Sequence, residues 1–70
     1  MSVRVILSKT VEVEEVDCKT RQSSMVTVSP KYPLHNVRVL WEDDEVLVVR
    51  LPNGNKLNNI PKDAVESVVW

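Results

Sequence analysis

Valine recurs at every second position in most segments of this chain, and this alternation constrains the fold more than any other feature. In the first such segment, Val3, Val5 and Leu7 share one face, while Arg4 lies on the other. β-Branched side chains at a period of two are typical of half-buried strands. We therefore predict one small all-β domain over residues 1–70. It is either a small antiparallel barrel or a strongly bent meander of about 5 to 7 short strands.

A chain of 70 residues has room for only a small core, and domains of this size bury about 60% of the surface that the unfolded chain exposes. Small folds are usually reinforced by disulfides, a metal or a partner subunit. Cys18 is the single cysteine, so no intrachain disulfide can form and no paired spacing for structural zinc exists. We expect no metal and no cofactor, and a stability that depends on good packing or on self-association.

The composition is that of an ordinary globular chain, with 43% hydrophobic residues, 27% charged residues and a net charge of -1. No apolar run approaches the roughly 20 residues of a membrane span. The apolar part of Met1–Thr10 is too short for a secretory signal. Together with the free cysteine, these features predict a protein of the reducing cytoplasm that does not bind membranes.

The clearest hairpin lies in Val37–Arg50, where two valine-rich runs flank an acidic turn. A turn at Asp43–Asp44 places Trp41 opposite Val46, on the face that we expect to form the core. The opposite face mixes apolar and charged side chains, so we expect another strand or a partner to cover it in part. The apolar residues on this second face are Leu40, Leu47 and Val49.

Two other short links also have the composition of turns. In Leu51–Asn55, Pro52 suits the first corner of a type I turn, and Gly54 suits the left-handed position of a three-residue hairpin loop. Ser8–Thr10 is polar and short enough for a hairpin between the first two strands. We therefore expect the chain to reverse at both links.

The last third of the chain combines a strand, a proline, a few helix-prone residues and a final apolar strand. Ile60, Pro61 and Val65 form the pattern hydrophobic-P-x-x-x-V. This pattern resembles the tail of Src-homology-3-like small barrels, which implies core positions for Ile60 and Val65 and one short helical turn near residues 61–65. In the peptide-binding members of that family an aromatic residue precedes the valine, and here it is Ala64. The resemblance therefore implies a small-barrel architecture without a proline-peptide groove.

Two sets of residues carry groups that are common in active or metal sites. The four acids of Glu42–Glu45 are consecutive and point apart at a tight turn, so we interpret them as a solvated hairpin tip rather than a cation site. Cys18 has basic neighbours that favour its thiolate, and a dyad with His35 is conceivable. So short a chain would also have to build a substrate pocket. We predict no catalytic residues and no enzyme.

Two hypotheses of function remain. The first is a protein-binding or self-associating module, because the core is small and the ring of Trp70 has to be buried somewhere. Its predicted site comprises Leu40, Leu47, Val49 and Trp70. The alternative is a small barrel that binds single-stranded nucleic acid through the basic segment 19–38, which contains no acid. The predicted site for this alternative comprises Lys19, Arg21, Lys31, Tyr32, His35 and Arg38.

Overall fold

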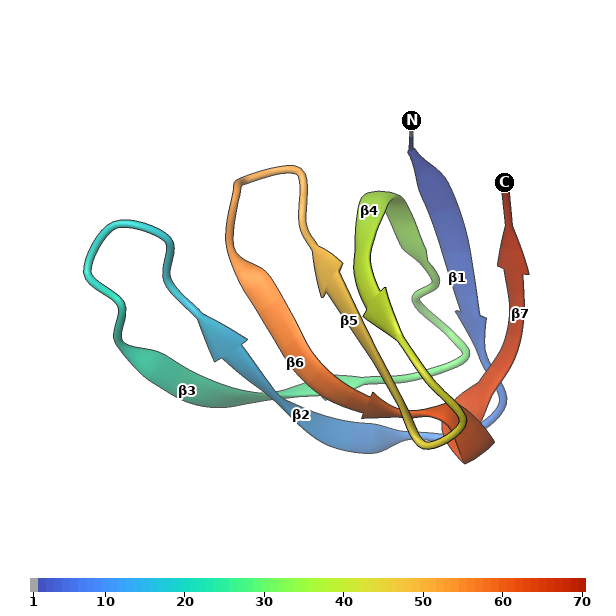
Figure 1. The fold of residues 1–70 in the computed structure, drawn as a ribbon. Coiled ribbons are helices and arrows are strands. Elements are labelled where there is room, and N and C mark those ends of the chain that lie inside the picture. Colours follow the sequence, from blue (N-terminus) through green and yellow to red (C-terminus); the bar gives the residue numbers. More distant parts are fainter. Residues whose placement is uncertain (1) are drawn as a thin grey trace.

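Seven strands and one short 3₁₀ turn make up the computed structural model of the chain, which describes residues 2–70 (Figure 1). The strands are β1 (Val3–Leu7), β2 (Val11–Val16), β3 (Ser23–Val28), β4 (Leu34–Glu42), β5 (Val46–Arg50), β6 (Lys56–Pro61) and β7 (Val65–Val69). The 3₁₀ turn spans Lys62–Ala64, between β6 and β7. These elements confirm the prediction of an all-β fold with a helical turn near residues 61–65.

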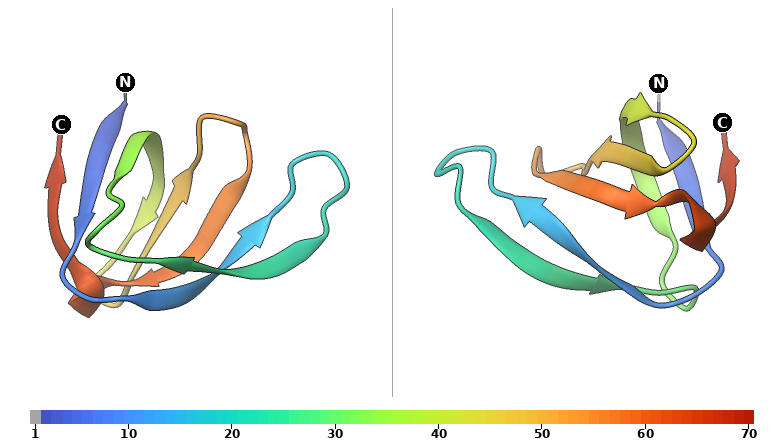
Figure 2. Two further views of the ribbon diagram at one scale, coloured as in Figure 1. Left: turned by 180° about the vertical axis from the view of Figure 1, so that it is seen from behind. Right: turned by 60° about the horizontal axis from the view of Figure 1, so that its bottom comes forward.

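All strands belong to one antiparallel sheet, in the order β3-β2-β6-β5-β4-β1-β7. The sheet is not closed, so β3 and β7 are its two edges. Figure 2 shows that the sheet is strongly bent, with the β2–β3 hairpin extending away from β1 and β7. The β4-β5-β6 meander joins the two ends of the sheet, and it therefore forms the centre of the molecule.

The core lies on the concave side of the bent sheet, which we call the inner face; the opposite side is the outer face. Every strand except β7 contributes at least one buried side chain, and Ala64 of the 3₁₀ turn is also buried. Alternation explains this arrangement, because residues two apart on a strand point to the same face. The buried apolar residues are Val3, Val5, Leu7, Val13, Val28, Val37, Leu47, Val49, Leu57, Ile60 and Ala64.

The predicted hairpin between the first two strands is wrong. β1 pairs with β4 and β7, whereas β2 pairs with β3 and β6. Ser8–Thr10 instead carries the chain from one part of the sheet to the other. The backbone N–H of Ser8 donates to the carbonyl of Ala64 at 2.7 Å, which holds this link against the 3₁₀ turn. A short polar link therefore serves here as a crossing between strands that do not pair.

The predicted core face of the β4–β5 hairpin is also wrong. Trp41 is 59% exposed and lies opposite Val48, not Val46. The register shifts between Val39 and Trp41, because Leu40 is an extra residue of β4, as in a β-bulge. One extra residue reverses the facing of every residue that follows it. Val39 therefore packs against the core while Trp41 points outward.

The turn between β5 and β6 agrees with its prediction. Gly54 has φ +92°, the left-handed region that a residue without Cβ adopts without strain. The N–H of Leu51 donates to the carbonyl of Asn55 at 2.7 Å, and the N–H of Gly54 donates to the carbonyl of Leu51 at 2.9 Å. This turn places Arg50 of β5 directly opposite Lys56 of β6.

Candidate functional site

A row of three cations crosses the outer face of the β4-β5-β6 meander. Arg38 lies opposite Arg50, and Arg50 lies opposite Lys56. These three residues alternate with the buried Val37, Val49 and Leu57, so their side chains point away from the core. Like charges directly opposite each other on neighbouring strands repel and destabilise a sheet. This cation row, Arg38-Arg50-Lys56, is therefore an arrangement that folding alone does not favour.

No ion pair among the described residues involves a member of the cation row. Within residues 2–70 the ion pairs are Lys9 with Asp63, at 3.3 Å, and Lys62 with Glu42, and neither involves a member of the row. Arg4 on β1 adds a further outward cation, because its neighbours Val3 and Val5 are buried and β1 is the next strand beyond β4. The outer face therefore has a local positive potential although the net charge of the chain is -1.

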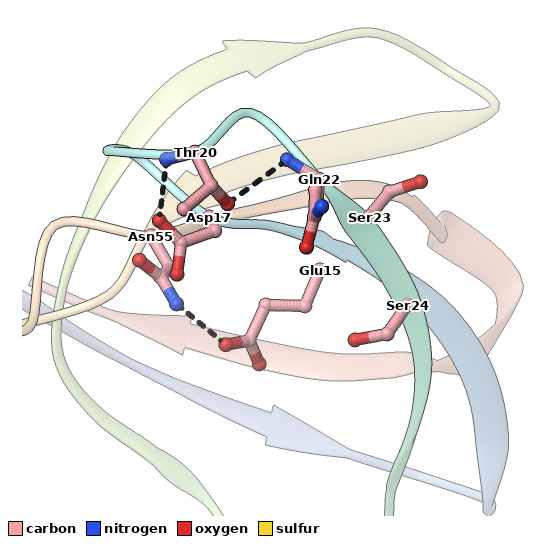
Figure 3. A pocket seen from close by; sticks show the side chains of 7 residues that line it. All are labelled: Glu15, Asp17, Thr20, Gln22, Ser23, Ser24 and Asn55. Atoms are coloured by element: carbon pink, nitrogen blue, oxygen red, sulfur yellow. Dashed lines mark hydrogen bonds between the residues drawn. The ribbon is translucent and has the colours of Figure 1, made fainter.

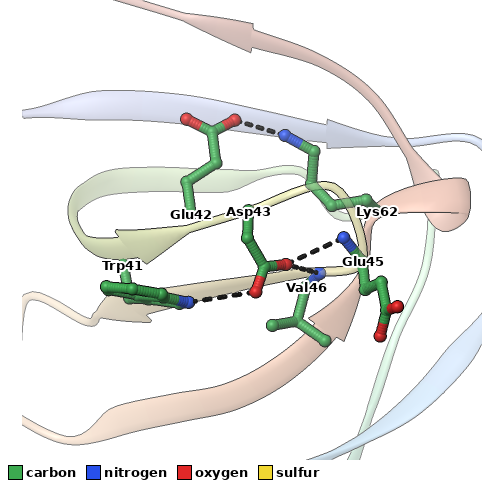
Figure 4. Close-up of polar contacts among 6 residues, drawn as sticks. All are labelled: Trp41, Glu42, Asp43, Glu45, Val46 and Lys62. Atoms are coloured by element: carbon green, nitrogen blue, oxygen red, sulfur yellow. Dashed lines mark hydrogen bonds and ion pairs between the residues drawn. The ribbon is translucent and has the colours of Figure 1, made fainter.

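An exposed aromatic ring lies beside the row. Trp41 is opposite Val48, which is two residues from Arg50 on the same face of β5. Such diagonal neighbours are within reach of aromatic and long side chains. The indole N–H of Trp41 donates to the Asp43 carboxylate at 3.3 Å and so restrains the ring, as Figure 4 shows. The sheet thus presents a large, oriented π surface next to Arg50, the middle cation of the row.

At the end of the row the outer face is hollowed. This cavity, of about 430 Å³, has three cations, Arg21, Arg50 and Lys56, in its wall, and we call it the basic recess. The side chain of Cys18 lies next to Gly54 on its floor, where a Cβ at position 54 would be 3.2 Å from Sγ. The other lining residues are Val16 and Asp17.

Hydrogen bonds fix the loop that forms one side of the recess. The Asp17 carboxylate accepts the backbone N–H groups of Lys19 and Thr20, at 2.7 and 3.0 Å. These bonds hold the pKa of Asp17 below its usual range. The Asn55 side chain links this loop to the β5–β6 turn, since it accepts the N–H of Cys18 at 3.2 Å and donates to Glu15 at 2.8 Å. The segment 17–22 is therefore an ordered loop.

A second cavity, of about 200 Å³, lies near this loop and is lined by polar side chains (Figure 3). Its two carboxylates, Glu15 and Asp17, already accept hydrogen bonds from Asn55 and from backbone N–H groups. No group of three or more His, Cys, Asp or Glu side chains suited to a metal ion occurs within the described residues 2–70. The remaining lining residues are Thr20, Gln22, Ser23, Ser24 and Asn55.

The acidic hairpin tip is a structural turn. The Asp43 carboxylate accepts the backbone N–H groups of Glu45 and Val46, both at 2.8 Å (Figure 4). The bond from Val46 contributes most to lowering the pKa of Asp43, and the bond from Glu45 contributes next. Glu42 pairs with Lys62 of the 3₁₀ turn. The carboxylates of Asp43 and Glu42 thus have separate partners and do not share a ligand site.

The residues predicted for protein binding do not form one surface. Leu47 and Val49 are 0% exposed and belong to the core, so assigning them to a binding surface is wrong. The prediction failed because the register of the β4–β5 hairpin turns these two side chains toward the core. Leu40 is 38% exposed at the bulge of β4, and Trp70 is 74% exposed after the edge strand β7.

The residues predicted for nucleic-acid binding also separate. Lys19 and Arg21 lie in the β2–β3 loop, whereas Lys31 and Tyr32 lie in the β3–β4 connection. The six residues of β3 stand between these two segments, a span of about 20 Å. The Nζ atom of Lys31 lies 5.8 Å from the centre of the Tyr32 ring, a cation–π contact.

Two of the residues predicted for nucleic-acid binding do contribute to the outer face. Arg38 belongs to the cation row and Arg21 to the basic recess. His35 is exposed near the start of β4. The prediction missed Arg50, Lys56 and Trp41. The sequence could have predicted that Arg50 pairs with Lys56, because these residues flank the turn at Leu51–Asn55, which was predicted correctly.

Comparisons with protein-family models, with curated proteins and with solved structures found no match in any of the three. None of the helical residues in the described part of the chain belongs to a helix long and apolar enough to cross a membrane.

Proposed function

We propose that this protein is a non-enzymatic module that binds single-stranded nucleic acid on the outer face of the β4-β5-β6 meander. The observation that carries this proposal is the cation row Arg38-Arg50-Lys56 beside the exposed ring of Trp41. Sequence-tolerant single-strand binding combines cations that follow the phosphates with aromatic rings on which bases stack. The outer face offers both groups side by side.

The arrangement of charge supports a polyanionic partner. Repulsion within the cation row is relieved when each cation meets a phosphate, so the row stabilises a complex more than it stabilises the free protein. The acidic tip at Asp43–Glu45 lies at the opposite end of β5 from Arg50. The nearest outward acid on β2, Glu14, accepts a hydrogen bond from Asn58 of β6 at 2.9 Å. The exposed thiol of Cys18 supports a reducing compartment such as the cytoplasm as the place of action.

A proposal about the fold family accompanies the proposed function. We place the chain with Src-homology-3-like small barrels, because one helical turn joins β6 to β7, because Ile60 is buried and because Val65 is partly buried against the core. Small barrels carry many different functions, so the proposed activity depends on the outer face alone.

Binding to fluorescent oligothymidylate and oligouridylate tests the proposal. Each phosphate that a single-strand-binding protein neutralises contributes about -0.7 to the slope of log K against log salt, so the three-residue row predicts a slope of about -2. Arg50→Gln should lower affinity and reduce the magnitude of that slope. Lys31→Gln makes the same charge change in the β3–β4 connection and should have little effect.

The stacking contact has its own matched pair of variants. Trp41→Ala should weaken binding about tenfold, the usual loss when one stacking ring is removed. Tyr32→Ala removes another strongly exposed ring, in the β3–β4 connection, and should leave affinity unchanged. Absence of binding at low salt, or equal effects of the two variants, would contradict the proposal.

A second candidate, self-association through β7, is favoured by the free edge of this strand. β7 pairs only with β1, and Val69 and Trp70 beside this edge are exposed. A second copy paired antiparallel about Ser67 would place Val65 opposite Val69 and Glu66 opposite Val68, so no like charges would meet. The same strand of each copy would then form the interface, as in a two-fold dimer.

Sedimentation at high protein concentration tests this second candidate. A dimer that Val69→Lys dissociates and that Met25→Lys leaves intact would support pairing through β7, since Met25 is an exposed residue of the other edge strand, β3. A strict monomer, or equal sensitivity to both variants, would exclude it.

A further inference from the structure

The basic recess lies where the cation row ends, and it gathers positive charge from three separate segments. Arg50 comes from β5, Lys56 from β6, and Arg21 from the β2–β3 loop. The only acid in its wall is Asp17, whose carboxylate is directed to the N–H groups of its own loop at 2.7 and 3.0 Å. The recess therefore presents three cations to a ligand, with the nearby acid already bonded.

The backbone at Arg21 adds a second, independent observation. Arg21 has φ +62°, a left-handed conformation that glycine or asparagine adopts with less strain. The other non-glycine residues with positive φ are both asparagines, Asn36 and Asn59. A strained residue persists where its side chain has a use that offsets the strain. Here the side chain adds a guanidinium to the recess.

The recess is also held in shape before any ligand arrives. The N–H of Cys18 is bonded to Asn55, and the N–H of Asn55 is bonded to the side chain of Asn53 at 2.9 Å. Gly54 allows the β5–β6 turn to approach Cys18 closely. Both loops around the cavity are therefore fixed relative to each other, which lowers the cost of ordering them on binding.

We propose that the basic recess binds a phosphate group of the nucleic-acid strand held on the outer face, with Arg21, Arg50 and Lys56 as its cationic ligands. Guanidinium groups suit this role because their N–H donors match phosphate oxygens in pairs. The inference depends on the proposed function, since it names the part of the strand that the recess receives. A terminal phosphate and a backbone phosphate share this chemistry.

Cys18 provides the readout, because it is the only thiol in the chain and forms part of the recess. Its alkylation by neutral iodoacetamide is followed by intact mass, in a buffer without phosphate. A bound phosphate shields the thiol from the reagent, so occupancy of the recess slows the reaction. The probes are oligothymidylate with a 5′-phosphate, the same oligonucleotide with a 5′-hydroxyl, and inorganic phosphate.

We expect saturating oligonucleotide to slow alkylation of Cys18 several-fold. If only the oligonucleotide with a 5′-phosphate slows alkylation, the recess binds a terminal phosphate. If the 5′-phosphate and 5′-hydroxyl oligonucleotides protect Cys18 equally, the recess binds a backbone phosphate. Lys56→Gln and Arg21→Gln should each raise the concentration needed for protection about tenfold, the usual effect of losing one charged hydrogen-bond partner. Lys31→Gln is the charge-matched control and should change nothing.

The two proposals fail in different ways. If oligonucleotides bind with the predicted dependence on Trp41 and salt but Cys18 reacts at an unchanged rate, the recess inference is overturned and the proposed function stands. If no oligonucleotide binds, the proposed function is overturned; protection by inorganic phosphate that Lys56→Gln abolishes would then still support a phosphate site. Loss of protection by every probe overturns the recess inference.

Discussion

Asp43 shows how one side chain decides the register of a hairpin. Its carboxylate accepts the N–H groups of both Glu45 and Val46, and its own N–H donates to the carbonyl of Val46 at 3.0 Å. The reversal is therefore centred on Asp44–Glu45, one residue later than alternation predicts. Side-chain bonds of this kind compete with backbone turns and are characteristic of aspartate.

The bonds to Asp43 predict a specific loss of stability in acid. Because they lower the folded-state pKa of Asp43 below its ordinary value in the unfolded chain, its contribution is fully present above that ordinary value and is lost as pH falls through the folded-state pKa. Asp43→Asn keeps the hydrogen-bond acceptor but cannot titrate. We expect its free energy of unfolding, measured by urea titration, to fall less below about pH 4 than that of the unchanged protein.

The control for this experiment is Asp44→Asn, at the neighbouring position of the same tip. Asp17 also has a lowered pKa, from the N–H groups of Thr20 and Lys19, so part of the acid sensitivity should remain in Asp43→Asn. Equal acid sensitivity of Asp43→Asn and Asp44→Asn would show that the Asp43 turn bonds do not stabilise the folded state.

Leu47 and Leu40 test which side of the hairpin faces the core. Leu47 is fully buried and Leu40 is partly exposed. Truncation of a buried leucine leaves a cavity and typically costs about 2 to 5 kcal/mol, whereas surface truncations cost about 0.5 kcal/mol or less. Urea titration should therefore show a large loss for Leu47→Ala and a small one for Leu40→Ala. Similar losses would contradict the register described here.

At the scale of elements, the β5–β6 hairpin was predictable and the β4–β5 hairpin was not. Pro52 and Gly54 are strong local signals, and both act within a few residues of the turn. The bulge at Leu40 has no local signal, because neither glycine nor proline lies near it in β4 and only the register against β5 shows the extra residue. A single extra residue then moved Trp41 from the predicted core to the surface.

The candidate site was only partly predictable for the same reason. Arg21 and Arg38 were identified from local charge, but their grouping depended on pairing among strands distant in sequence. The crossing at Ser8–Thr10 is another such case, since its composition suits a hairpin while β1 finds its partners in β4 and β7. Local patterns thus predicted strands and one turn, and long-range pairing decided which faces meet.

The β5–β6 turn also yields a test of backbone strain. Gly54→Ala would impose a left-handed conformation on a residue with Cβ and place that Cβ 3.2 Å from Cys18 Sγ. We expect a cost of about 1 to 2 kcal/mol, mainly from the conformation. In a Cys18→Ala background the close contact is absent, so a double-mutant cycle by urea titration separates the two causes.

Most of the cost should remain in the Cys18→Ala background. If the cost disappears there, contact with the sulfur is the main cause and the conformational argument is wrong. A Gly54→Ala variant as stable as the original chain would contradict both explanations.

At the scale of the whole molecule, charge is segregated although the net charge is -1. The acids of Glu42–Glu45 lie at one end of the β4–β5 hairpin, and Arg50 and Lys56 flank the turn at the other end of β5. A molecule with separated charges has a large dipole and orients a charged partner before contact. We therefore expect Asp44→Lys to raise the association rate with oligothymidylate, and the affinity by the same factor, while leaving the dissociation rate nearly unchanged.

Stopped-flow measurements at low and high salt check this expectation. Arg50→Gln should instead speed dissociation, since it removes a contact that the bound strand uses. An effect of Asp44→Lys on dissociation alone would contradict the division between orienting charges and contacting charges.

The pairing of β1 with β7 brings the first and last strands side by side, with Arg4 opposite Val69 (Figure 1). A host polypeptide could enter the domain and leave it at almost the same point, so the fold is suited to insertion into a surface loop of a larger protein. In such a fusion the junction would lie beside β4, because Val3 pairs with Val37, whereas β5 and β6 are the next strands beyond β4.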